Sequence, residues 1–354
     1  MRLPIRGLPV VAAVFLLVAP GAAHAQQPVM PVIGFLGTST AAAWAGYVAG
    51  FRQGLSEAGY VDGRNVTIEF RWAEGRSDRL SALAADLVGR RVTVVVTSTG
   101  VAAALAAKAA TPTIPVVFVM GADPVEFGLV ASFNRPGGNL TGVSFLLNVL
   151  VPKRLQVLHQ LVPTTRAIGV LVHPNNPNAV SDTKNVEAAA RALRLRTHVV
   201  TARTERDFDA AFAIVIADVL TAEHRERIVA LATRNRLPVI SEFRNFADSG
   251  ALLTYGSSGP DAGRRAAYFV DKILKGANPA HLPVEQPTKF ELVINLRAAK
   301  ALGLAIPPSL RLRANHVIES VHAAQHHAAA DWPLALLAPR ALSGTFDARR
   351  TNRR

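Results

Sequence analysis

The chain has 354 residues, of which 50% are hydrophobic and 18% are charged. This composition supports a sizeable core, excludes disorder as the main state, and at roughly 100–200 residues per domain indicates two domains. The absence of cysteine excludes disulfides, thiolate metal sites, cysteine nucleophiles and a lipid-modified N-terminal cysteine. A formal charge of +14 suggests a nucleic-acid or acidic-membrane partner, but aromatic residues, at 6%, are too few for base-stacking platforms.

The first 25 residues have the pattern of an export signal. Arg2 and Arg6 form a positive region, 8–19 is an apolar run, and Ala23-His24-Ala25 is a small-x-small cleavage site. The apolar run is shorter than the about 20 residues that a membrane span requires. We therefore predict cleavage after Ala25 and, in a double-membrane bacterium, a periplasmic protein that is not a lipoprotein.

The basic excess is concentrated at the two ends of the chain. The leader holds two of the 39 basic residues and none of the 25 acidic ones, so the remainder carries +12. Residues 321–354 contain five arginines and two aspartates, which leaves about +9 on residues 26–320. No dense basic block occurs there, so we expect a solvated, mixed-charge surface and no nucleic-acid partner.

From residue 30 onward, short β-rich runs alternate with helical patterns, which is typical of a parallel sheet covered by helices. The first half predicts strands at 31–36, 66–70, 92–96 and 114–119, an extended segment at 140–145, and helices near 44–58, 78–88 and 97–110. We expect Trp44, Tyr47 and Phe51, on one face of the first helix, to belong to the core.

The pattern breaks near 135–139 and then begins again. The second half predicts strands at 167–172, 197–201, 214–219, 238–241, 251–256 and 291–295. It predicts helices at 152–161, 178–193, 222–235 and 261–275, another that begins at 205, and a last one that ends at 302. This repetition predicts an α/β protein of two doubly wound, Rossmann-like lobes joined by a hinge, with a cleft between them.

No sequence motif nominates an enzyme or a cofactor. The chain has no P-loop lysine motif, no GxGxxG after a strand, no HExxH and no GxSxG. Its histidines have no metal-ligand spacing in the core, and the cluster at 322–327 is typical of chance composition. We therefore expect no catalytic residue, no cofactor and no metal.

The ends of the predicted strands instead carry short polar side chains. Thr97, Ser98 and Thr99 follow the third strand, and Thr38 and Ser39 follow the first. Their hydroxyls, together with free helix N–H groups, suit a ligand carboxylate, although helix N-capping alone also explains such residues.

Acidic and amide side chains follow other strands. Asp123 and Glu242 each come after a strand end and are candidates for the ammonium group of an amino acid, or else surface carboxylates or local caps. Asn175 lies in the run His173-Pro-Asn-Asn-Pro177, which also ends a strand and which turn formation alone would explain.

Long phrases of the chain resemble a known family. They are Phe51-Arg-Gln-Gly-Leu-Ser-Glu-Ala-Gly-Tyr60, Asn134-Arg-Pro-Gly-Gly-Asn-Leu-Thr-Gly-Val-Ser144, Asn175-Asn-Pro-Asn178, Tyr255-Gly256 and Pro287-Thr-Lys-Phe-Glu-Leu-Val-Ile-Asn295. Over about residues 26–319 the chain resembles the exported ABC-transporter substrate-binding proteins of the tryptophan/tyrosine type. We add Ser144 and Tyr255, which lie in these phrases, to the candidate ligand-binding residues.

The resemblance implies a type I periplasmic-binding-protein fold, in which the chain crosses three times between two lobes. It also implies delivery of a small, amino-acid-like or carboxylated solute to an ABC permease in the inner membrane. We expect a monomer with lobe 1 at 26–143 plus about 256–319 and lobe 2 at 144–255. The alternatives are a ligand-sensing protein for a membrane receptor, a copy with impaired binding and, more remotely, an exported enzyme.

Two departures from the family pattern stand out. Residues 213–224 are shorter than the corresponding family segment and lack its aromatic residues, so that a wall of the ligand site is expected to be reduced. Residues 320–354 extend beyond the usual family terminus and are rich in alanine and arginine, so we expect a poorly ordered basic tail.

Overall fold

The computed structural model describes residues 30–98, 100–174, 176–203, 214–215, 219–287 and 289–319. The chain divides into two units, Met1–Glu319 and Ser320–Arg354, and every described residue belongs to the first. The predicted export signal, the helix expected from residue 205 and the predicted basic tail lie outside the described residues.

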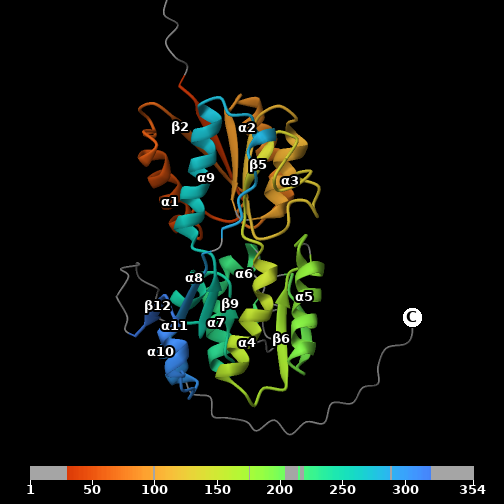
Figure 1. Ribbon diagram of the computed structural model, residues 1–354, viewed down its shortest axis with the longest axis vertical. Helices are drawn as coiled ribbons and strands as arrows, with labels where there is room; N and C mark the ends of the chain where they lie inside the picture. The colour runs from red at the N-terminus through yellow and green to blue at the C-terminus, as the bar shows by residue number, and fades with distance from the viewer. Residues whose placement is uncertain are drawn as a thin grey trace, which may run out of the picture. The chain divides into compact units, whose positions relative to one another are not determined.

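The first sheet has five parallel strands in the order β2-β1-β3-β4-β5. These strands are β1 (Val32–Gly37), β2 (Thr67–Trp72), β3 (Val94–Ser98), β4 (Val116–Met120) and β5 (Leu140–Ser144). The connecting helices are α1 (Ala45–Glu57), α2 (Leu80–Gly89), which follows a 3₁₀ turn at Ser77–Arg79, and α3 (Val101–Ala110). Figure 1 shows α1 on one face of this sheet and α3 on the other.

Both faces of the first sheet are buried. Ile33 and Phe35 of β1 belong to one apolar cluster with α1 and α9 (Gly259–Leu274), whereas Leu36 belongs to a second cluster with α2 and α3. This alternation follows from the two-residue period of a strand. Burial on both faces explains why these strands consist of nearly continuous apolar runs.

The second sheet has seven strands in the order β12-β11-β10-β9-β8-β6-β7. They are β6 (Ala167–Val172), β7 (Arg196–Thr201), β8 (Ile214–Val215), β9 (Ile240–Ser241), β10 (Leu253–Gly256), β11 (Glu291–Asn295) and β12 (His316–Ile318). The helices of this part are α4 (Val151–Leu161), α5 (Ala179–Ala192), α6 (Val219–Glu223), α7 (Arg225–Arg234), α8 (Arg244–Asp248), α10 (Leu296–Ala301) and α11 (Pro308–Arg313). Two 3₁₀ turns, Leu147–Leu150 and Pro279–His281, complete the described elements.

The chain passes between the two sheets after β5, after β10 and before β11. Helix α9 leaves β10 and packs against α1, where a Cβ atom added to Gly263 would lie only 2.2 Å from the carbonyl oxygen of Tyr47. Glu285 then forms a parallel bridge with Val143 at the end of the first sheet. These passages confirm the predicted α/β fold of two doubly wound lobes.

The expected boundary of lobe 1 was wrong at its C-terminal end. Residues 291–319 do not accompany α9 into the first lobe, because β11 pairs antiparallel with β10 and β12 pairs parallel with β11. Leu292 and Ile294 of β11 are buried in the apolar cluster of the second sheet. The apolar run 291–295 identified a strand, but it carried no information about which sheet would accept it.

Three predicted boundaries also shift. Strand β3 continues to Ser98, and α3 begins at Val101 rather than at 97. Of the strand expected at 214–219, residues 214–215 form β8, residues 216–218 lie outside the described residues, and α6 already begins at Val219. Among the described helices none is long and apolar enough to cross a membrane.

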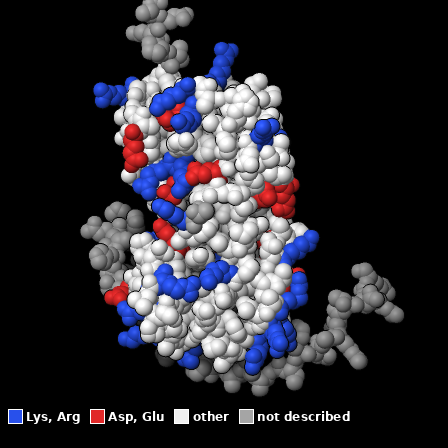
Figure 2. Space-filling view, in the orientation of Figure 1, with Lys and Arg blue, Asp and Glu red and all other residues white. Residues whose placement is uncertain are grey.

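Basic and acidic side chains are interspersed on the face shown in Figure 2, as expected for a solvated, mixed-charge surface.

Candidate functional site

Three hydroxyl groups at the carboxyl edge of the first sheet are buried without a hydrogen-bond partner. They belong to Thr38, Thr97 and Ser98, and we call them the strand-end hydroxyls. The register of β1 and β3 pairs Gly37 with Ser98. Thr38, the residue after Gly37, therefore follows the end of β1 beside the end of β3. Buried hydroxyls are almost always hydrogen-bonded, and three unsatisfied ones at one sheet edge indicate a site for a ligand or for water.

The capping alternative does not apply to Thr97 and Ser98. Both residues are the last of β3, and the residue at the N-cap position of α3 is Gly100. Gly100 has no side chain to cap the helix, and among the described residues no capping hydrogen bond from Thr97 or Ser98 is present. The two hydroxyls are therefore available for another acceptor.

A small cavity of about 40 Å³ lies between residues of the two lobes. Its lining is mostly aromatic and aliphatic: Trp44, Tyr47, Val119, Met120, Gly121, Phe145, Leu147, Phe243, Ser257, Gly259 and Ala262. Trp44 from the first lobe contacts Phe243 from the second edge-to-face, with ring centroids 5.4 Å apart. The Nε1 atom of Trp44 and the hydroxyl of Tyr47 are buried without a partner.

Of these two cavity residues, Tyr47 is more deeply buried than Trp44. Burial raises the pKa of its hydroxyl far above the ordinary value, so the group is a neutral donor at physiological pH. Trp44 and Tyr47 were expected to be core residues, and both do belong to the apolar cluster of α1 and α9. They also line the cavity, a second role that helical spacing alone could not reveal.

Ser39 is already engaged in the structure. It is fully buried, and its hydroxyl donates a hydrogen bond of 3.0 Å to the Oε1 atom of Glu223, at the end of α6. This bond joins the two lobes. Ser39 therefore acts here as a contact between the lobes rather than as an unsatisfied donor for a ligand.

Glu242 follows β9, as expected, but its carboxylate is paired. The guanidinium of Arg154, on α4, donates to Glu242 and to the carbonyl oxygen of Leu147. The side chains of Arg154 and Glu242 are only 7% and 9% exposed, so the pair is buried. The Nε atom of Arg154 and the hydroxyl of Ser241, the residue before Glu242, are buried without partners.

The next acidic side chain of this region is Asp182, in the first turn of α5. Its pKa is raised to about 7: burial is the largest cause, the negative charges of Glu242 and Glu126 also raise it, and the positive charge of Arg154 opposes them. Arg154 and Asp182 could not be identified from the ends of the predicted strands, because both residues lie on helices. Helix α4, which carries Arg154, packs against β9 and against α5, which carries Asp182.

The other predicted site residues have local roles. The Asp123 carboxylate accepts a hydrogen bond of 2.8 Å from the backbone N–H of Val125, which closes a turn. The Ser144 hydroxyl is buried and donates to the carbonyl oxygen of Ala122 at 2.7 Å. Tyr255 packs in the core, with its ring 6.3 Å from that of Phe290. Thr99 and Asn175 lie outside the described residues.

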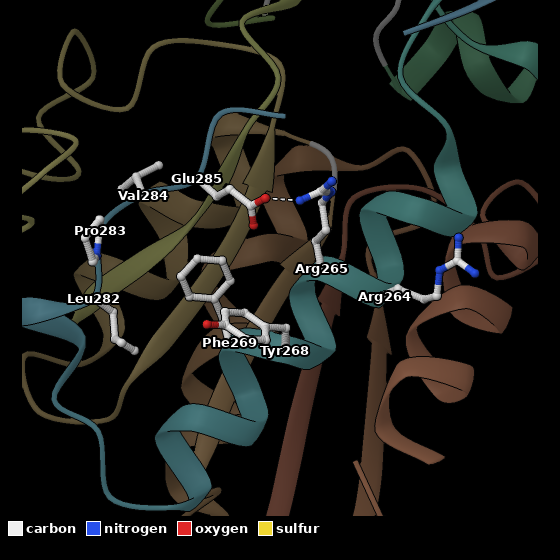
Figure 3. Close-up of a pocket in the computed structure, with 8 residues that line it drawn as sticks. All are labelled: Arg264, Arg265, Tyr268, Phe269, Leu282, Pro283, Val284 and Glu285. Carbon is white, nitrogen blue, oxygen red and sulfur yellow. Dashed lines mark hydrogen bonds and ion pairs between the residues drawn. The ribbon is translucent and has the colours of Figure 1, made fainter. Parts of the chain in front are cut away.

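A second, larger cavity of about 660 Å³ lies beside α9, where Leu282 and Phe269 face it (Figure 3). The charged side chains that line it are paired: Arg265 with Glu285 and with Asp261, and Arg264 with Asp261. In the described part of the chain, this cavity therefore presents no unpaired charge that would select a ligand. The described residues also contain no group of three or more ligand-type side chains that could hold a metal ion.

Residues 40–318 match the model of the ABC transporter substrate binding protein family. The chain belongs to this family. The tyrosine-binding protein of Clostridioides difficile (strain R20291) is 27% identical to it over 264 residues, which are 72% of this chain and 76% of that protein.

Solved structures agree with the assignment to this substrate-binding family. A conserved domain protein from Vibrio cholerae is 27% identical, with a TM-score of 0.76 over 81% of this chain and 99% of its own. An ABC domain from Streptococcus pneumonia in complex with L-Trp is 25% identical, with a TM-score of 0.74 and the same coverage. The fold expected from the resemblance, that of the periplasmic-binding proteins, is thus confirmed.

Proposed function

We propose that the chain is the extracytoplasmic solute-binding component of an ABC importer, and that it holds a small amino-acid-like or carboxylated ligand between its two lobes. The observation that carries this proposal is the set of strand-end hydroxyls, Thr38, Thr97 and Ser98, buried at the carboxyl edge of a parallel sheet without partners. In open α/β sheets ligands bind at this edge.

The chemistry of these hydroxyls suits a carboxylate. A buried polar group without a hydrogen bond costs on the order of 1–3 kcal/mol, and a hydrogen bond to a charged acceptor contributes about 1.5–3 kcal/mol. A carboxylate has two oxygens that can accept from several hydroxyls at once. Binding such a group therefore both removes an existing cost and adds charge-assisted hydrogen bonds.

The aromatic cavity favours an apolar or aromatic side chain on the ligand. Its walls come from both lobes, and Trp44 and Tyr47 add two unpartnered donors. Its volume of about 40 Å³ has room for only a few waters, since one water needs at least about 10–15 Å³ on this measure. Entry of an amino acid therefore requires that the lobes separate and close again around it.

This requirement gives a physical mechanism for capture. A ligand that touches both lobes binds the closed arrangement better than the open one, and it shifts the population by that difference in affinity. The names of two relatives support an amino acid as the ligand class: one is a tyrosine-binding protein and the other was solved with L-Trp. No step of this mechanism requires a nucleophile, a cofactor or a metal.

Native mass spectrometry of the purified protein tests the ligand class directly. We expect a fraction of the protein to carry a single small molecule whose mass matches an amino acid or another small carboxylated compound, and unfolding should release it. A bound compound without a carboxylate, or catalytic turnover of that compound, would contradict the proposal.

The location and assembly belong to the same proposal. We propose that the leader is removed after Ala25 and that the mature protein is a periplasmic monomer that delivers its ligand to a permease. N-terminal sequencing of the exported protein should begin at Gln26. Light scattering should give the mass of one mature chain, and a stable dimer would contradict the monomer.

A further inference from the structure

The carboxylate of Glu223, at the end of α6 in the second lobe, contacts the first lobe at two places. Its Oε1 atom accepts a hydrogen bond of 3.0 Å from the hydroxyl of Ser39, whose side chain is fully buried. Its Oε2 atom lies against Gly75, where an added Cβ atom would be only 2.6 Å away. Glu223 therefore fits between Ser39 and Gly75, and we call these three residues the lobe latch.

Two neighbouring strands of the first sheet supply the first-lobe side of the latch. β1 pairs with β2, and the chain continues from their carboxyl ends to Ser39 and to Gly75. The backbone N–H groups of Glu74 and Gly75 donate to the carbonyl oxygens of Ser39 and Thr38, at 3.3 and 3.0 Å. These bonds fix the turn after β2 against the turn after β1. The latch thus lies directly beside Thr38, one of the strand-end hydroxyls.

The backbone at Gly75 has a conformation and a neighbour that both require glycine. Glu74 and Gly75 have φ angles of 55° and 78°, which lie in the left-handed region. Glycine adopts this region without a steric cost, whereas Glu74 is strained there. Strained residues persist where surrounding contacts fix them, and they cluster at functional sites. The turn after β2 is therefore shaped to leave room for the Glu223 carboxylate.

The segment 39–44 of the first lobe contacts the second lobe at a further point. Trp44, at the end of this segment, meets Phe243 edge-to-face, with ring centroids 5.4 Å apart. Both rings line the aromatic cavity. The lobes cannot separate along this segment without breaking both the latch and the aromatic contact.

The latch is formed in an arrangement whose cavity, about 40 Å³, is too small for an amino acid. Its contacts therefore do not require the ligand, and they must break before a ligand enters or leaves. Resting on the function proposed above, we infer that Glu223 is a positioning residue that holds the lobes closed with or without a ligand. The latch thereby limits the rates of ligand entry and release.

Such a contact has a kinetic signature that a ligand-binding residue lacks. Loss of the latch raises the open fraction of the free protein, so association becomes faster because more molecules can accept a ligand. It also raises the open fraction of the complex, so dissociation becomes faster. Affinity, which is the ratio of the two rates, changes less than either rate. Loss of a contact to the ligand itself changes mainly the dissociation rate.

Stopped-flow fluorescence on the full chain measures both rates. The probe is L-tyrosine, and the signal is tryptophan emission, because Trp44 lines the cavity. For Glu223→Ala we expect association and dissociation each to be about tenfold faster, as for loss of a hydrogen bond of about 1.4 kcal/mol, with affinity changed less than about threefold. Glu223→Gln keeps an acceptor of the same shape and should restore both rates to within about threefold of the wild type.

Gly75→Ala tests the latch without changing Glu223, and Gly63→Ala is its matched control. Gly63 has a φ of 79°, so alanine is strained there to the same extent, but an added Cβ atom meets nothing within 4 Å. We expect Gly75→Ala to accelerate both rates and Gly63→Ala to leave them unchanged. In the double variant Gly75→Ala/Glu223→Ala the rates should equal those of Glu223→Ala alone, because the clash requires the carboxylate.

The outcomes separate this inference from the proposed function. If L-tyrosine binds but Glu223→Ala leaves both rates unchanged, or accelerates dissociation alone, the latch is refuted and the solute-binding function stands. Equal rates for Gly75→Ala and Gly63→Ala would also refute it. If the wild-type protein binds neither L-tyrosine nor L-tryptophan, the amino-acid ligand fails, and small-angle scattering then decides the latch. It predicts a larger radius of gyration for Gly75→Ala than for Gly63→Ala, and equal radii would overturn it.

Discussion

Replacing Arg154 with methionine should destabilise the protein strongly and in a pH-dependent way. The substitution removes the partner of Glu242 and leaves that carboxylate buried without its cation. Removing one member of a buried ion pair typically costs about 3–5 kcal/mol, because the remaining charge is left uncompensated.

Protonation sets an upper limit to this cost. An ordinary glutamate side chain requires about 3.7 kcal/mol to be protonated at pH 7 and about 1 kcal/mol at pH 5. The variant can always escape its buried charge by taking up this proton. We therefore expect a loss near 4 kcal/mol at pH 7 that shrinks towards 1 kcal/mol at pH 5, in addition to the lost hydrogen bond to Leu147.

Urea unfolding followed by circular dichroism, at pH 5 and at pH 7, measures both values. The double variant Arg154→Met/Glu242→Leu is the matched control: it removes both charges, and such apolar replacements are often neutral or stabilising. The reasoning is refuted if Arg154→Met costs less than about 1 kcal/mol at pH 7, or if its cost is the same at the two pH values.

Three further substitutions test other parts of the structure. Gly263→Ala places a methyl group against the backbone of α1 and should lower the free energy of unfolding by about 1–3 kcal/mol. The control Gly46→Ala should be neutral or stabilising, because the nearest neighbour of the added methyl group is 3.9 Å away. Equal thermal midpoints of the two variants would contradict the close α1–α9 contact. Asn295→Ala removes the cap of α10 and the bond to the carbonyl oxygen of Ala247, and urea titration should show a loss of about 1–3 kcal/mol. Glu223→Ala breaks the bond to Ser39 and should favour the open arrangement, seen as a larger radius of gyration in ligand-free protein by small-angle scattering; an unchanged radius would show that this bond does not hold the lobes.

The sequence was sufficient to predict two doubly wound lobes and the sheet edge that carries the strand-end hydroxyls. Buried parallel strands are continuous apolar runs, so β1, β3 and β4 could be recognised from composition. Because the carboxyl ends of parallel strands meet at one edge, Thr38, Thr97 and Ser98 could be expected together. These inferences need only periodicity and chain order.

Partner identity could not be predicted in the same way. The pairing of Ser39 with Glu223 joins residues 184 positions apart, and that of Arg154 with Glu242 joins residues 88 positions apart. Both depend on how helices pack against the second sheet. The assignment of β11 to that sheet likewise depends on a neighbour, β10, that an apolar run cannot specify.

The central claim is that the strand-end hydroxyls hold the carboxylate of a ligand. The most direct test is calorimetric titration of L-tyrosine and L-tryptophan into ligand-stripped wild-type protein and into the double variant Thr97→Val/Ser98→Ala. The isosteric control is Thr67→Val, because Thr67 is the first residue of β2 and lies at the amino edge of the same sheet. We predict saturable one-to-one binding by the wild-type and control proteins. In the double variant, loss of about 1.5–3 kcal/mol would weaken affinity about 10- to 150-fold. An affinity that the double variant retains in full would contradict the claim.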